Sequence, residues 1–84
     1  MSRWFKTPRN CGGTAINLDA VSQLYVLPDT GEACSVWARD GSYSMRVCNV
    51  KNRSDAFRII DQLIRLPAGD RVYTIGSIKK GWKK

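Results

Sequence analysis

The chain has 84 residues, a net charge of +7 and no histidine. This length fits one small domain, and a hydrophobic content of 43% is typical of globular rather than disordered chains. No apolar run approaches the ~18 residues of a membrane span, and no secretory signal follows the basic N-terminus. We therefore expect a single cytoplasmic domain over residues 1–84, with basic ends at 1–3 and 77–84 that are candidates for disorder.

Catalysis is not expected from this composition. Histidine is the commonest general base, and the chain has none. Its three cysteines, Cys11, Cys34 and Cys48, lack the paired spacing of a disulfide framework or a zinc site. The sequence therefore predicts no enzymatic activity, no metal site and no cofactor.

The N-terminal third reads as short strands separated by turns. Pro8 limits a first strand because proline cannot donate to a sheet ladder. The apolar alternation then changes phase at Asp19-Ala20, which indicates two short strands with a bend or bulge between them. In order, we expect a strand over 2–7, a loop at 10–13, strands over 14–18 and 21–27, and a turn at 28–31.

Two alternating runs joined by Asp40-Gly41 predict a β-hairpin, because this dipeptide favours a two-residue turn. In the implied register Trp37 faces Ser44, and side chains alternate between the two faces. The inner, core face then carries Cys34, Val36, Ala38, Tyr43, Met45 and Val47. The outer face carries Ser35, Trp37, Arg39, Ser44, Arg46 and Cys48.

A helix is expected over residues 52–66, capped by Asn52 or alternatively by Ser54, and ended by Pro67. Its predicted apolar stripe, which should pack on the inner hairpin face with Phe57 and Met45 near the centre, is Ala56, Phe57, Ile60, Leu63 and Ile64. Residues 71–75 follow as a last strand, at an edge or across a dimer seam, and 76–84 as a tail. The expected fold class is α+β: an antiparallel meander of four to five strands with one helix packed on one face.

The stretch Ile16-Asn-Leu-Asp-Ala-Val-Ser-Gln-Leu-Tyr-Val26, followed by the hairpin and the helix, resembles a loose group of small uncharacterised bacterial and phage proteins. The resemblance covers about residues 14–66 and implies a meander plus one helix. Small phage and plasmid proteins of this type are often inhibitors of host machinery, including anti-CRISPR proteins. The Trp-rich basic ends and the extension after Pro67 depart from the group's pattern.

Two basic and aromatic regions are candidate binding sites. On the outer hairpin face, Trp37 is flanked by Arg39 and lies near Arg46, a combination suited to interfaces and to stacking on bases. The alternative is that this face is covered, by the N-terminal strand, by the segment Val72–Ile75 or by another copy of the chain. The second region comprises the two ends, with Arg3, Trp4 and Lys6 at the start and Lys79, Lys80, Trp82, Lys83 and Lys84 at the finish. If the ends lie apart, each is a solvated tail.

These observations predict a non-enzymatic binding protein of phage or mobile-element character. Its basic and aromatic surface would dock on nucleic acid or on an acidic, nucleic-acid-handling host complex, since excess positive charge favours anionic partners. The alternative is a homo-oligomer whose sheets pack through the Trp37 face, with or without a small anionic ligand at the seam.

Overall fold

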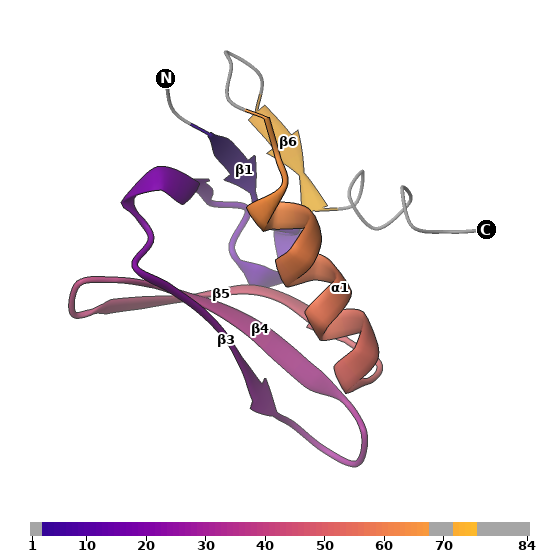
Figure 1. The fold of residues 1–84 in the computed structure, drawn as a ribbon. Coiled ribbons are helices and arrows are strands. Elements are labelled where there is room, and N and C mark those ends of the chain that lie inside the picture. The colour runs from indigo at the N-terminus through magenta and orange to yellow at the C-terminus, as the bar shows by residue number, and fades with distance from the viewer. Residues whose placement is uncertain (1–2, 68–71, 76–84) are drawn as a thin grey trace.

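The computed structural model describes residues 3–67 and 72–75, which form two three-stranded sheets and one α-helix (Figure 1). The larger sheet is an antiparallel meander in the order β3-β4-β5. Its strands are β3 (Gln23–Pro28), β4 (Cys34–Asp40) and β5 (Tyr43–Val50). The expected α+β class and the meander are confirmed.

The N-terminal strands form a second, smaller sheet rather than extending the meander. In this sheet β1 (Trp4–Lys6) pairs antiparallel with β2 (Ala15–Asn17) and parallel with β6 (Val72–Thr74). A 3₁₀ turn at Arg9–Cys11 connects β1 to β2. A second at Leu18–Ala20 is the predicted break between the two strands, and it redirects the chain from one sheet to the other.

The helix α1 (Arg53–Ile64) begins and ends near the predicted positions. The side chain of Asn52 caps it by accepting a hydrogen bond from the backbone N–H of Asp55 at 2.9 Å. Asp61 and Arg65, one helical turn apart, form an ion pair at 3.3 Å. In the described part of the chain, no helix has the length and apolar character needed to cross a membrane.

The helix is rotated relative to the predicted stripe. It buries Ala56, Ile59 and Leu63, whereas Phe57 remains 54% exposed and Ile64 59% exposed. Phe57 is therefore not at the centre of the core, contrary to expectation. The apolar arc of α1 is wider than the surface that the sheet covers, so one part of the arc packs and the rest faces outward.

One hydrophobic core joins the helix to both sheets. It includes Phe5 from β1, Ile75 directly after β6, Val36 and Ala38 from β4, and Leu63 from α1. In Figure 1 the helix and the smaller sheet lie on the same side of β3-β4-β5. The larger sheet therefore has a covered inner face and an outer face on the opposite side.

The hairpin register differs from the prediction. Asp40 pairs with Tyr43, so the turn residues are Gly41 and Ser42. Only Gly41 has a positive φ, of 64°, which is the pattern of a type II′ turn rather than the expected Asp-Gly turn.

A β-bulge opposite Val36 and Trp37 then changes the face of the residues that follow it on β5. Val36 pairs with Cys48, which is fully buried, as is Val47. Cys48 therefore points inward, not outward as predicted, and Asn49 takes its place on the outer face. None of the three cysteines forms a disulfide.

Two substitutions on α1 distinguish the observed helix rotation from the predicted one. Leu63 is fully buried, so Leu63→Ala should lower the free energy of unfolding by about 2–5 kcal/mol. Phe57→Ala should cost about 1 kcal/mol or less, because much of the ring already contacts water. Denaturant unfolding followed by circular dichroism measures both values, and a larger cost for Phe57→Ala would contradict the observed packing.

Candidate binding face

The outer face of β3-β4-β5 brings together residues from all three strands. Alternation along the strands and the observed pairing place nine side chains on it. We call this set the outer sheet face: Gln23, Tyr25, Leu27, Ser35, Trp37, Arg39, Ser44, Arg46 and Asn49.

The centre of the outer sheet face is a row of three residues across the strands. Tyr25 pairs with Trp37 on one side, and Arg46 pairs with Trp37 on the other. The Arg46 guanidinium carbon lies 5.3 Å from the centre of the Trp37 ring, within the range of a cation–π contact. The Tyr25 hydroxyl donates a hydrogen bond to the Ser44 hydroxyl at 3.2 Å. The row therefore presents two aromatic rings and a cation in a fixed arrangement.

The Trp37 side chain is held against the sheet. It is half-buried, and its indole Nε1 is buried without a hydrogen-bond partner among the described residues. A buried N–H group that lacks a partner is costly.

The charge of the outer sheet face has one sign. Arg39 and Arg46 are both exposed, and neither forms an ion pair with a described residue. None of the nine residues is acidic. The field at this face therefore attracts anions, and nothing on it competes for the two guanidinium groups.

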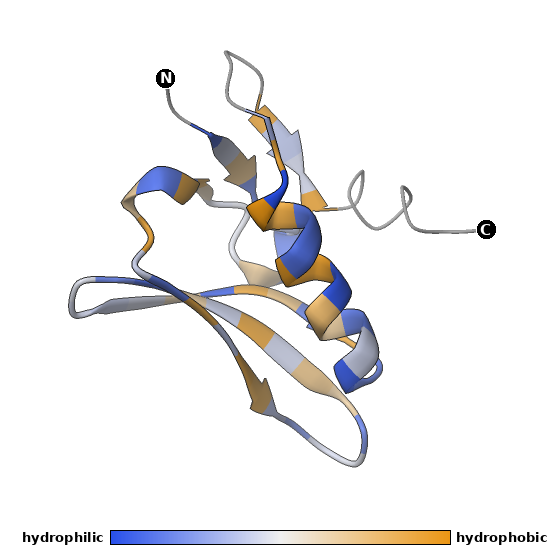
Figure 2. Cartoon of the chain, viewed as in Figure 1, coloured by the Kyte–Doolittle hydropathy of each residue, from blue (hydrophilic) through white to orange (hydrophobic). Residues whose placement is uncertain are grey.

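Neither of the two chain segments considered as covers lies over this face. Phe5 of β1 and Ile75 after β6 are buried in the core on the inner side. Figure 2 shows the mixed hydropathy of the larger sheet, with the helix and the smaller sheet placed on its inner side only. Arg39, Ser44 and Arg46 are exposed accordingly.

The predicted N-terminal site residues lie elsewhere in the fold. Trp4 and Lys6 are exposed on the smaller sheet, and Trp4 lines a pocket with Met45, which is on the inner side of β5. They therefore do not join the outer sheet face. The predicted site residues Lys79, Lys80, Trp82, Lys83 and Lys84 lie outside the described residues.

Arg3 makes contacts within the fold instead of facing outward. Its Nε donates to the Asp19 carboxylate at 2.9 Å, and its backbone N–H donates to the other oxygen of that carboxylate at 2.9 Å. Its Nη1 donates to the carbonyl of Ile64, in the last turn of α1, at 2.9 Å. A cation at this position satisfies a free helix carbonyl and complements the helix dipole. Arg3 thus ties the start of β1 to the turn at Leu18–Ala20 and to the end of the helix.

The contact between Arg3 and Asp19 changes the acidity of the carboxyl group. The hydrogen bond from the Arg3 side chain lowers the pKa of Asp19 below its ordinary value. The two side chains are 28% and 37% exposed, so solvent screens the pair in part.

Tyr25 is the one residue of the central row that sequence reasoning did not select. Its position opposite Trp37 depends on the register between β3 and β4, which the long turn after Pro28 leaves open. The sequence signal that could have placed Tyr25 on this face is its alternation with Gln23 and Leu27 at every second position.

Among the described residues, no cluster of acidic or cysteine side chains suits a metal ion.

Comparison of the chain with protein-family models, with curated proteins and with solved structures finds no match.

The depressed pKa of Asp19 predicts how the Arg3 contact depends on pH. The folded pKa is below the unfolded one, so the contribution of Asp19 to stability is complete above the ordinary carboxyl pKa and is lost as pH falls through the folded pKa. Asp19→Asn should therefore be less stable than the wild type at neutral pH, with a difference that shrinks in acid. Urea unfolding at a series of pH values measures this; a difference independent of pH would refute the assignment.

Proposed function

We propose that this chain is a non-enzymatic, cytoplasmic binding protein that docks on single-stranded nucleic acid through the outer sheet face. The observation that carries the proposal is the row Tyr25, Trp37 and Arg46 on a sheet face over which no described helix or strand lies. Aromatic rings on a sheet provide surfaces on which bases stack, and arginine adds both charge and a planar stacking group.

The side chains of the outer sheet face favour a single strand of nucleic acid over a duplex. The aromatic side chains of this face belong to a sheet, and the helix lies on the other side of that sheet (Figure 1), so it cannot enter a duplex groove beside them. A duplex keeps its bases stacked on one another, so the rings of Tyr25 and Trp37 would gain little from it. A single strand can place its bases on these rings and its phosphates near Arg39 and Arg46.

Binding to a nucleic-acid-handling host complex, in the manner of a phage or mobile-element inhibitor, is the biological setting we propose for this face. The excess positive charge of +7 favours such an anionic partner. In that setting the outer sheet face would compete with the strand that the complex normally holds.

Self-association through the Trp37 face is the alternative. It would bury the indole, but it would also bring Arg39 and Arg46 of two copies together, and the face holds no acidic residue to balance them. Like charges at an interface cost several kcal/mol unless they are compensated. The charge of this face therefore supports an anionic partner over a second copy.

Affinity for a fluorescein-labelled oligothymidine, measured by anisotropy at low salt, tests the proposal. Trp37→Leu should weaken binding by about 1–3 kcal/mol, the value of one stacked base. Arg46→Gln should weaken it as well and should reduce the slope of log affinity against log salt by about 1. A hairpin duplex of the same composition should bind more weakly than the single strand.

Arg58→Gln supplies the matched control, because Arg58 is an exposed arginine on α1, away from the outer sheet face. It removes the same charge and should change affinity less than Arg46→Gln. A chain with Lys79, Lys80, Lys83 and Lys84 replaced by glutamine separates the contribution of the C-terminal lysines. The proposal fails if no binding occurs at low salt, or if Arg46→Gln and Arg58→Gln have equal effects.

A further inference from the structure

The edge of the larger sheet at β3 has no charged residue. In the described part of the chain β3 pairs only with β4, so its other edge is open. Its residues Gln23–Pro28 are uncharged, and the proline stands at the end of the strand. Natural edge strands are usually protected by charges, bulges or covering segments, because an open edge pairs readily with another strand. The β3 edge lacks the charge that would discourage such pairing.

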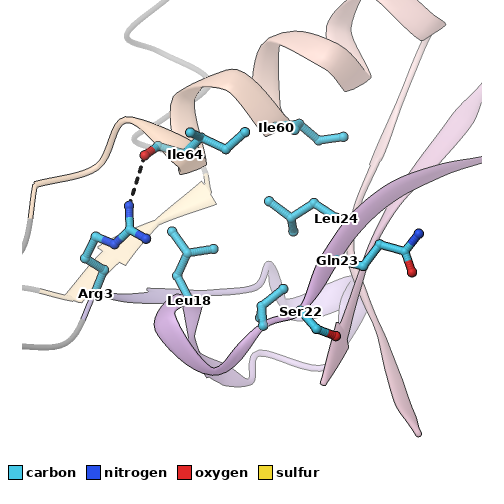
Figure 3. Close-up of a pocket in the computed structure, with 8 residues that line it drawn as sticks. Arg3, Leu18, Ser22, Gln23, Leu24, Ile60 and Ile64 are labelled. Carbon is cyan, nitrogen blue, oxygen red and sulfur yellow. Dashed lines mark hydrogen bonds between the residues drawn. The ribbon is translucent and has the colours of Figure 1, made fainter. Parts of the chain in front are cut away.

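An apolar groove runs between β3 and the helix. It has a volume of about 280 Å³ and is lined by Leu18, Val21 and Leu24 on one side and by Ile60 and Ile64 on the other. Figure 3 shows the side chains of Leu18, Leu24, Ile60 and Ile64 directed toward one another, with Arg3 at one end. The groove therefore adds apolar surface next to the open strand.

The helix runs antiparallel to β3. Leu24, near the start of the strand, shares this groove with Ile64 at the end of the helix. Pro28, at the end of the strand, lines a second pocket with Arg53 at the start of the helix. The exposed Phe57 is on the same helical face as Ile60 and Ile64, at the spacing i, i+3, i+7. The apolar surface that α1 leaves exposed thus flanks the open edge.

We propose that the β3 edge is the interface of a homodimer, in which β3 pairs antiparallel with β3 of a second copy about a two-fold axis perpendicular to the sheet. Such an axis makes one continuous six-stranded sheet and an isologous interface. It places both helices on the same side, where the exposed apolar face of one α1 meets that of the other. It also places both outer sheet faces on the opposite side, where Gln23, Tyr25 and Leu27 of the two copies adjoin at the seam.

Charge favours a second copy as the occupant of this edge. A chain with a net charge of +7 can pair with itself only where the contacting surfaces carry no net positive charge. Residues Gln23–Pro28 are uncharged, and Phe57 and Ile64 are apolar. The surface that would be paired therefore carries no charge to oppose the pairing.

The two faces of the sheet restrict the register. Directly opposed residues of an antiparallel pair share a face, so Tyr25 must oppose an outer residue and Leu24 an inner one. A register centred on Tyr25 meets this condition: Leu24 opposes Val26 of the second copy, and Gln23 opposes Leu27. It also leaves Pro28, which has no N–H, outside this pairing.

Sedimentation equilibrium of the full chain from about 1 μM to about 1 mM tests for the dimer. We expect a mass of twice the chain's at the upper end of this range. Phe57→Gln should raise the dissociation constant by about tenfold or more, because it removes apolar contact in both copies. Tyr43→Gln is the matched control: Tyr43 is a 76% exposed aromatic residue on the opposite edge strand, so this change should have no effect.

A charge exchange tests the register itself, at two exposed positions that leave the core intact. The double variant Gln23→Lys with Leu27→Lys sets like charges opposite each other twice, and should weaken the dimer roughly 2- to 30-fold. The double variant Gln23→Glu with Leu27→Lys sets opposite charges in the same places and should restore it. Circular dichroism spectra should match the wild type in both.

A chain that remains monomeric across the range overturns the proposal, as does a dimer that neither double variant affects. A dimer abolished by Trp37→Leu but not by Phe57→Gln would assign self-association to the outer sheet face instead. Binding of a peptide strand by a monomer whose β3 amide signals shift would likewise assign the edge to another partner. Oligothymidine affinity is also measured on the Phe57→Gln variant. This measurement distinguishes a failure of the dimer proposal from a failure of the proposed nucleic-acid binding.

Discussion

The structure is governed by one constraint: a sheet has two faces, and the described part of this chain covers only one of them. The helix α1 and the smaller sheet both pack on the inner face of β3-β4-β5, where they share a single core. The outer sheet face therefore has Trp37 at its centre and, beside it, two arginines that form no ion pair with a described residue. A large aromatic residue at such a place is consistent with a contact to another molecule.

The small size of the sheet also explains the second exposed surface, which is the outward part of the apolar arc of α1. The helix has a wide apolar arc, and the sheet beneath it is three strands wide. Once Ala56, Ile59 and Leu63 are packed, Phe57 and Ile64 have no further strand to contact, so they flank the open β3 edge. Arg3 fixes this arrangement, because it joins the end of the helix to Asp19 and the first strand. The outer sheet face lies on one side of the sheet, and the exposed part of the α1 arc lies on the other.

Local patterns predicted most of the elements. The Asn52 cap, the extent of the helix, the turn after Pro28 and the break near Asp19 all follow from short-range chemistry, and each is present. Trp37 and Arg46 were expected on one face near each other, and the structure places them directly opposite. The hairpin turn is the exception among the local predictions, because the structure moves it by one residue, to Gly41 and Ser42.

Features that depend on packing between distant parts of the sequence were not predicted. The bulge opposite Val36 and Trp37 turns Cys48 inward, and no local sequence pattern indicates this bulge. The parallel pairing of β1 with β6 joins the two ends of the chain, so its register depends on the whole fold. The rotation of α1, which exposes Phe57, depends on which part of a wide apolar arc fits the sheet best. Arg3 was predicted as a binding residue because its charge was visible, while its partner Asp19 was identifiable only in three dimensions.

Chemical-shift mapping would show directly whether the outer sheet face is the binding surface. Backbone amide spectra of the full chain would be recorded as oligothymidine is added at low salt. We expect the shifted signals to belong to the outer-facing residues of β3, β4 and β5, with Tyr25, Trp37 and Arg46 among the largest. The signals of the inner-facing α1 residues Ile59 and Leu63 should stay in place. Shifts confined to the smaller sheet, to the helix or to residues 76–84 would contradict this expectation.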